Sequence, residues 1–199
     1  MLYKMAGKSR RKIINNSPLV IGFIAASFIV TLAGQLTGGR STELLFMTYR
    51  SSLLNPLTYF RMFSHVLGHE GFEHFLGNAM YILLLGPMLE EKYKSQTLLE
   101  IILITAFVTA LINMIFFRNN ALCGASGVVF AFILMASFTR FRDGEIPITF
   151  LLVAVIYIGQ QIIEGITIVD NISNMAHIAG GLIGAISGYS LNKKSRYGY

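Results

Sequence analysis

The stretch NMAHIAGGLIGAISG (residues 174–188) sets small residues along one side of an apolar segment. At helical spacing, one face carries two polar residues followed by glycines: Asn174, His177, Gly181, Gly184 and Gly188. Small residues at a helix interface let two backbones approach closely within a membrane. We expect this face to pack against the small residues Gly127 and Ala131, which would bring His177 within hydrogen-bond reach of Ser126. The pattern therefore predicts a tightly packed helical bundle.

The composition places this bundle in a membrane. The 199 residues are 54% hydrophobic and 13% charged, whereas about a quarter of the residues are charged in a typical soluble protein. Apolar segments near the ~20 residues that span a bilayer lie at 18–36, 72–89, 97–117, 125–139, 146–163 and 172–191. We predict an all-α polytopic membrane protein with six transmembrane helices in one domain (18–191). A basic cytoplasmic N-terminal tail (1–17) and a cytoplasmic C-terminal tail (192–199) flank it.

The charge distribution predicts the orientation. Of the 16 Lys and Arg residues, only four lie on the predicted outer side, namely Arg40, Arg50, Arg61 and Arg118. The positive-inside rule then places both termini in the cytoplasm. The net charge of +6 thus reflects topology, and we expect no nucleic-acid partner. The first apolar segment is too long for the h-region of a signal peptide. The short basic N-terminus lacks the length of an organelle transit peptide, so we expect a bacterial plasma membrane.

Two features of the predicted topology favour a recess on the external side. The long segment 37–71 is too polar to span and rich in aromatic residues, which is typical of a loop associated with the membrane surface. The segment 125–139 would span only ~23 Å, less than the ~30 Å of a hydrocarbon core. Arg140 and Arg142 fix its cytoplasmic end, so Ser126 would lie below the external surface. Non-helical backbone before it, at membrane depth, predicts a water-filled pocket.

The polar residues of the predicted spans include a set that could perform acyl transfer. His74, Asn78, Ser126 and His177 would each lie within about two helical turns of an outer end. A serine becomes a nucleophile when a neighbouring histidine accepts its proton. Asn78, His74 and the Ser126 N–H could donate to the oxyanion that forms. Asp170 is ~10 Å from His177 along the helix, so we expect a Ser-His dyad.

Simpler roles exist for each of these residues. A membrane serine is often a packing residue, a membrane histidine can bridge helices, and a glycine stripe alone signals only packing. Other polar residues in the spans are Asn113, Gln160, Gln161 and Asn174. We interpret Cys123 as a small packing residue and predict that His65 and His69 hydrogen-bond within the loop.

These motifs together resemble the rhomboid family of intramembrane serine proteases. GASG (124–127) is similar to the family's G-x-S-G nucleophile motif, AHIAGGLIG (176–184) to its A-H-x-x-G motif, and HFLGN (74–78) to its H-x-x-x-N motif. FRMFSHVLGH (60–69) and GPMLEEKY (86–93) resemble the segments that flank the second helix. The resemblance covers residues 56–190 in the same order.

The resemblance implies a six-helix rhomboid-like bundle, an activity and a set of roles. Ser126 would be the nucleophile, His177 the general base, and His74, Asn78 and the Ser126 amide the oxyanion hole. Gly124, Gly127, Phe130 and Gly181 would shape the site. The implied substrates are single-span membrane proteins, which would enter from the lipid beside the predicted span 146–163, and no cofactor or metal is implied. The chain departs from the family where Phe60 precedes Arg61 in place of a tryptophan, and where Phe130 replaces a tyrosine found in some members.

Three alternatives remain. HEGFEH (69–74) suggests a metalloprotease, but the histidines are five apart rather than four, about 140° apart on a helix. A non-catalytic rhomboid-like protein would bind membrane clients, although such relatives typically lose the serine or histidine. A transporter or channel would require intramembrane carboxylates or an internal repeat, and we find neither in the sequence.

Overall fold

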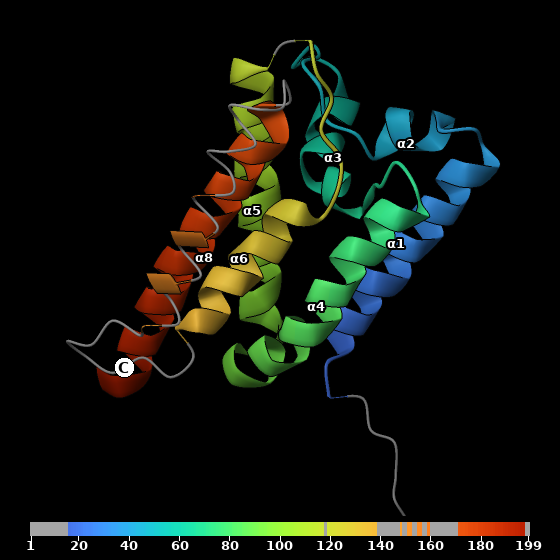
Figure 1. Cartoon of the computed structure of the whole chain (residues 1–199). Helices are drawn as coiled ribbons and strands as arrows, with labels where there is room; N and C mark the ends of the chain where they lie inside the picture. Colours follow the sequence, from blue (N-terminus) through green and yellow to red (C-terminus); the bar gives the residue numbers. More distant parts are fainter. Residues whose placement is uncertain are drawn as a thin grey trace, which may run out of the picture.

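The computed structural model describes residues 16–117, 119–138 and 171–197, together with positions 148, 151, 152, 155, 156 and 159. These residues are helical apart from loops and one isolated β-bridge (Figure 1). The long helices are α1 (Pro18–Leu36), α4 (Phe72–Tyr93), α5 (Ser95–Phe116), α6 (Ser126–Ser137) and α8 (Asn171–Tyr197). Two short α-helices, α2 (Arg40–Leu45) and α3 (Pro56–Ser64), and the 3-10 helix η1 (His65–Leu67) connect α1 to α4. The predicted all-α class is confirmed.

Five of the six predicted spans coincide with a long helix. The segment 146–163 lies outside the described residues except for single positions, as do the N-terminal tail to residue 15 and the basic residues Arg140 and Arg142. Among the described helices, α1 and α5 are long and apolar enough to cross a membrane. The count of six spans and their orientation remain predictions.

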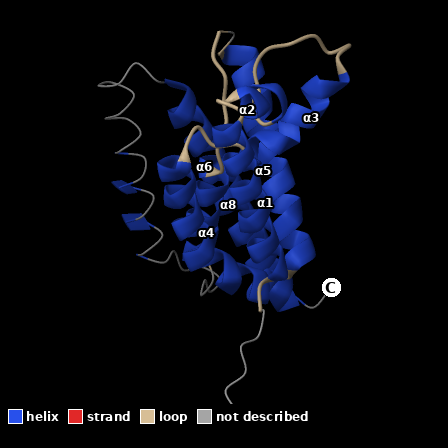
Figure 2. Cartoon of the chain, turned by 90° about the vertical axis from the view of Figure 1, so that its right-hand side faces the viewer, coloured by secondary structure: helices blue, strands red, loops and turns tan. Residues whose placement is uncertain are grey.

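The two ends of the described chain lie at the same end of the bundle, opposite α2 and α3 (Figures 1 and 2). Buried Glu90 near the C-terminus of α4 accepts hydrogen bonds from the backbone N–H groups of Leu19 and Val20, both at 2.9 Å. These N–H groups have no partner within α1 because they belong to its first turn. Lys92 donates to Asn192 of α8 at 2.7 Å. The start of α1 and the end of α8 are thus both tied to the end of α4.

Helix α6 is the short central helix of the bundle. Its 12 residues correspond to about 18 Å, and its Val128, Ala131, Phe132 and Met135 side chains are fully buried. In Figure 1, α6 begins well below the upper end of α5. The short helix expected at 125–139 is therefore present, and its first residue, Ser126, lies inside the bundle.

The close contact predicted between α6 and α8 is present, with one change of residue. A Cβ built on Gly184 would lie 2.6 Å from the Cα of Ala131. One turn closer to His177, the residue in contact with Gly127 is Gly180, whereas the sequence suggested Gly181. Both positions are at helical spacing from Gly184, and Gly181 is also buried. The way the two helices cross decides which glycine makes the contact.

The segment 37–71 folds over the pocket end of the bundle. Buried Arg61 of α3 donates from Nε to the carbonyl oxygen of Leu44 at 2.8 Å, and its guanidinium lies 4.5 Å from the centre of the Tyr49 ring. Phe60 packs edge-on against Phe46. Arg61 therefore joins α3 to the end of α2. The association of this segment with the membrane surface remains a prediction.

Candidate active site

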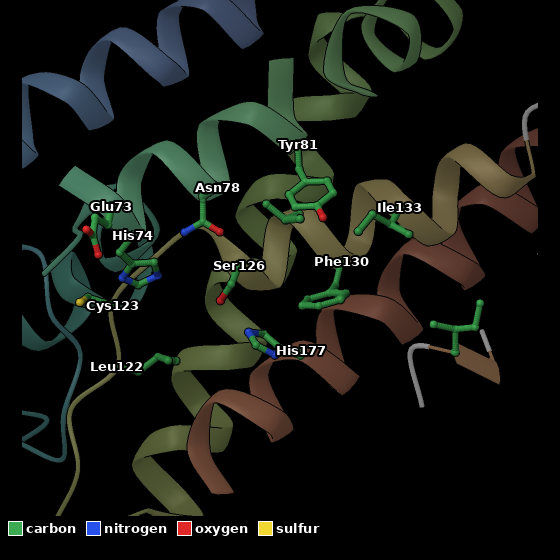
Figure 3. Close-up of a pocket in the computed structure, with 13 residues that line it drawn as sticks. Glu73, His74, Asn78, Tyr81, Leu122, Cys123, Ser126, Phe130, Ile133 and His177 are labelled. Carbon is green, nitrogen blue, oxygen red and sulfur yellow. The ribbon is translucent and has the colours of Figure 1, made fainter. Parts of the chain in front are cut away.

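A pocket of about 570 Å³ lies between α4, α6 and α8. His74 and Asn78 of α4, Ser126 and Phe130 of α6, and His177 of α8 all line it. Figure 3 shows the Ser126 hydroxyl and the His177 ring turned toward one another, with Asn78 above them. Residues from three distant parts of the chain thus line one cavity. This agrees with their predicted positions, each within about two turns of an outer helix end. Their chemical roles remain predictions.

Gly124 fixes the turn that leads into Ser126. Its φ of +119° lies in a region that residues with a Cβ rarely adopt. A Cβ at this position would also lie 2.7 Å from Cε1 and 2.8 Å from Nε2 of His74. Both observations require glycine, one for the backbone and the other for the imidazole.

Hydrogen bonds from distant segments hold the same turn. The Gly124 N–H donates to the His65 carbonyl oxygen at 3.0 Å. Two residues earlier, Leu122 and Thr48 exchange backbone hydrogen bonds of 2.9 and 2.8 Å. Asn113 of α5 donates to the Thr48 carbonyl oxygen at 3.1 Å. The backbone before Ser126 is therefore anchored to the loop between α1 and α4 and to α5.

His65 and His69 each bond through Nδ1 within the external segment, as predicted, and through Nε2 to a residue outside it. His65 Nε2 lies 3.2 Å from the Thr109 hydroxyl. His69 Nδ1 lies 3.2 Å from the Leu67 carbonyl oxygen, so this nitrogen donates and Nε2 accepts from the Ala125 N–H at 3.4 Å. Burial lowers the pKa of both histidines to about 4, and the nearby His74 contributes for His69. Both rings are neutral at pH 7.

The ring of His177 packs against Phe130. Their centroids are 4.5 Å apart, with a tilt of 45° between the planes. Phe130 is one turn after Ser126, so α6 supplies both the hydroxyl and the ring beside the imidazole. Gly127 follows Ser126 in α6 and touches α8, since a Cβ built on Gly180 would lie 2.9 Å from the Gly127 Cα.

The pocket also offers hydrogen-bond donors without acceptors. The Asn78 side chain is buried, and its Nδ2 has no partner among the described residues. The first N–H groups of α6, beginning at Ser126, have no carbonyl within the helix. Buried donors are normally satisfied. Unsatisfied donors beside a hydroxyl suit a group that becomes negatively charged.

Cys123 also lines the pocket. Burial raises the pKa of its thiol to about 12, and the Glu70 carboxylate adds to the effect. A thiol with this pKa is protonated at pH 7 and therefore a poor nucleophile. This agrees with its interpretation as a packing residue.

The geometry does not favour the metalloprotease alternative. His69 precedes α4 and does not share a helix with His74. Both ring nitrogens of His69 have protein partners. Across the described residues, no group of three or more His, Cys, Asp and Glu side chains could hold a metal ion.

Some site residues were not identified from the sequence, and others lie outside the described structure. Glu73, Gly77 and Tyr81 of α4 line the pocket. Their spacing of four residues, parallel to that of His74 and Asn78, is the signal that could have identified them. Gln160, Gln161 and Asp170 lie outside the described residues.

Comparison with known proteins identifies the family. The family model of the Rhomboid domain matches residues 56–194. This chain belongs to the rhomboid family. Together with the apolar helices, the rhomboid domain indicates an integral membrane protein.

The chain is also similar to individual rhomboid relatives. It is 31% identical over 160 residues to Rhomboid-related protein 2 of Mus musculus, covering 70% of this chain and 53% of that protein. It is 25% identical over 200 aligned positions to RHOMBOID-like protein 1 of Arabidopsis thaliana, covering 94% of this chain and 50% of that protein. The chain spans about half the length of these two relatives.

Proposed function

We propose that this rhomboid is an intramembrane serine endopeptidase that cleaves transmembrane or juxtamembrane segments of single-span membrane proteins. The observation that carries the proposal is the shared pocket of Ser126 and His177, which Asn78 also lines; the buried Nδ2 of Asn78 has no partner among the described residues. A hydroxyl, a base and an oxyanion donor are the groups that acyl transfer requires.

In the proposed reaction, His177 accepts the proton of the Ser126 hydroxyl as its oxygen attacks the scissile carbonyl carbon. The tetrahedral intermediate places negative charge on the former carbonyl oxygen. Asn78, His74 and the Ser126 N–H stabilise this charge. The intermediate then expels the amine, which takes the proton from His177, and leaves an acyl-serine. A water molecule, deprotonated by His177, hydrolyses the ester and restores the hydroxyl.

Phe130 lies near His177 where some family members have a tyrosine. It cannot offer the hydrogen bond that the tyrosine hydroxyl could make. Its ring lies 4.5 Å from the imidazole, centre to centre. A phenyl ring orients the imidazole by packing alone, because it has no polar atom. The packing of Phe130 against the imidazole therefore contributes to the position of His177.

The site would operate below the external surface of a bacterial plasma membrane, with both termini in the cytoplasm. The depth of Ser126 supports this arrangement, since α6 begins inside the bundle (Figure 1). A helical substrate has its carbonyl groups engaged in hydrogen bonds. It must therefore unwind locally into the pocket before cleavage, after entering from the surrounding lipid.

The test uses purified protein in liposomes with a single-span substrate. Ser126→Ala and His177→Ala should each abolish cleavage, whereas Ser137→Ala should retain it. Ser137 lies on the same helix, and its hydroxyl donates to the Ile133 carbonyl oxygen at 3.1 Å. Cleavage that persists in Ser126→Ala or His177→Ala would exclude the dyad. Wild-type protein that binds the substrate without cutting it would favour the non-catalytic alternative.

A further inference from the structure

A second row of α4 residues lines the pocket beside His74 and Asn78. Glu73, Gly77 and Tyr81 follow one another at intervals of four residues and therefore share one helix face. The proposed reaction uses no group from this row. These three residues are available to contact the side chains of a substrate held at Ser126.

The row borders an open slot at the edge of the pocket, and all three of its residues are exposed. Among the described residues, nothing lies within 4 Å of a Cβ built on Gly77, so the space between Glu73 and Tyr81 can admit a side chain. Ile133 of α6 also lines the pocket. Figure 3 shows Tyr81 and Ile133 toward one end and Glu73 at the other, beside His74. The slot thus has an apolar inner end and a carboxylate at its outer end.

Glu73 has no hydrogen-bond or ion-pair partner among the described residues. An acidic residue in the first turn stabilises a helix through its dipole. This stabilisation of the helix does not explain why Glu73 lines a pocket or why the space beside Gly77 is open. The carboxylate, with Tyr81 and Ile133 along the same pocket, instead matches a ligand with an apolar stem and a cationic head.

We propose that Glu73, Gly77 and Tyr81 form a specificity subsite for a lysine or arginine side chain of the substrate. This inference rests on the proposed protease function. Glu73 lies about one helical turn, ~5–6 Å, from Gly77, a distance that an extended lysine stem can cover. An extended substrate advances ~3.3–3.6 Å per residue. Because Ser126 and the slot line the same pocket, we expect the selected basic residue close to the scissile bond.

The first experiment measures cleavage of a reconstituted single-span substrate by the wild-type protein. Each of the two residues on either side of the scissile bond is changed in turn to Lys, Arg, Gln, Leu or Glu. At one of these positions, Lys or Arg should raise kcat/KM over Gln by roughly three- to fivefold, as an exposed ion pair allows. Equal kcat/KM values for Lys, Arg and Gln at all four positions would overturn the subsite.

Variants of the slot separate recognition from stability. Glu73→Gln should remove the preference for a basic residue, and Glu73→Lys should reverse it toward Glu. Gly77→Leu should lower cleavage of the Lys substrate relative to one with Ala, because it fills the slot. Loss of helix stability alone would reduce all substrates by the same factor. An unchanged Lys-to-Gln ratio in Glu73→Gln would overturn the proposal.

Glu70→Gln is the matched control. Glu70 is an exposed glutamate three residues before Glu73 and does not line the pocket. Glu70→Gln should keep the preference for a basic substrate residue. Loss of that preference in Glu70→Gln would show that it depends on the overall negative charge near the pocket, and would overturn the subsite. Failure of the wild-type protein to cut any substrate would reject the protease function and the subsite with it. Cleavage without a charge preference would reject only the subsite.

Discussion

Gly180 of α8 and Gly127 of α6 touch backbone to backbone. A Cβ at position 180 would lie 2.9 Å from the Cα of Gly127 and closer still to its carbonyl oxygen. His177 is three residues before Gly180, and Ser126 is adjacent to Gly127. The contact that brings the helices together therefore lies directly beside the proposed nucleophile and base. Helix packing and dyad geometry depend on the same small residues.

Gly180→Ala should separate α8 from α6 and impair both stability and cleavage. The added methyl group cannot avoid backbone atoms by a change of rotamer, so the helices must shift. We expect a loss of about 1–3 kcal/mol in the free energy of unfolding, as for other overpacked interiors. Thermal unfolding in detergent and the cleavage rate in liposomes measure the two effects.

Gly22→Ala in α1 provides the control for this substitution. Among the described residues, nothing lies within 4 Å of a Cβ built on Gly22, and alanine favours a helix over glycine by about 1 kcal/mol. This variant should be as stable as the wild type or more so, with unchanged cleavage. Equal effects of the two substitutions would contradict the close contact between α6 and α8.

A second glycine substitution acts on the turn before the nucleophile. Gly124→Ala should lower kcat by roughly 10- to 100-fold, because it strains a backbone with positive φ and displaces the His74 ring. Gly71→Ala is the control near the same ring, since Gly71 has an extended backbone and open space at its Cβ. Wild-type kcat in Gly124→Ala would show that the turn and His74 do not constrain the site.

The sequence predicted the α6–α8 contact because helical periodicity relates distant glycines to one face. It selected Gly181 where the structure has Gly180, since both are at helical spacing from Gly184 and the crossing of the helices decides between them. The second row on α4, which begins at Glu73, was also missed. Its central member, Gly77, has no side chain, so the row shows no continuous polar or apolar pattern in the sequence.

The anchoring of the turn before Ser126 could not be predicted in detail. Its partners Thr48, His65 and His69 lie in irregular or short helical segments, where no periodicity indicates which groups meet. The prediction that His65 and His69 bond within the loop gave their general role. Their specific acceptors and donors depend on the path of the segment 37–71 over the bundle, which is a tertiary property.

These two histidines predict a loss of stability in acid. Their pKa is about 4 in the folded protein, against about 6.5 when unfolded. The unfolded chain therefore binds more protons between these values, so stability is complete above about pH 6.5 and falls as the pH drops toward 4. The upper limit is about 3 kcal/mol for each histidine.

Unfolding temperatures in detergent at pH 7.5 and pH 5 measure this dependence. His69→Gln should reduce the difference between the two temperatures, because glutamine does not titrate and can accept from the Ala125 N–H. Substitution of the exposed Glu43 by Gln controls for a general change of charge and should leave the difference unchanged. If His69→Gln shows the same difference between the two unfolding temperatures as the wild type, His69 is not the buried neutral group that causes the loss of stability in acid.

The unsatisfied amide of Asn78 leads to the last prediction. Its Nδ2 is buried without a partner in the described structure, and in the proposed reaction this donor binds the oxyanion. Asn78→Ala should therefore lower kcat by about 10²–10³-fold with a small change in KM, as expected for a donor that acts mainly in the transition state. The change should leave the unfolding temperature nearly unaltered, because no internal hydrogen bond of Nδ2 is lost. Steady-state cleavage in liposomes separates kcat from KM, and a higher KM at unchanged kcat would instead assign Asn78 to substrate binding.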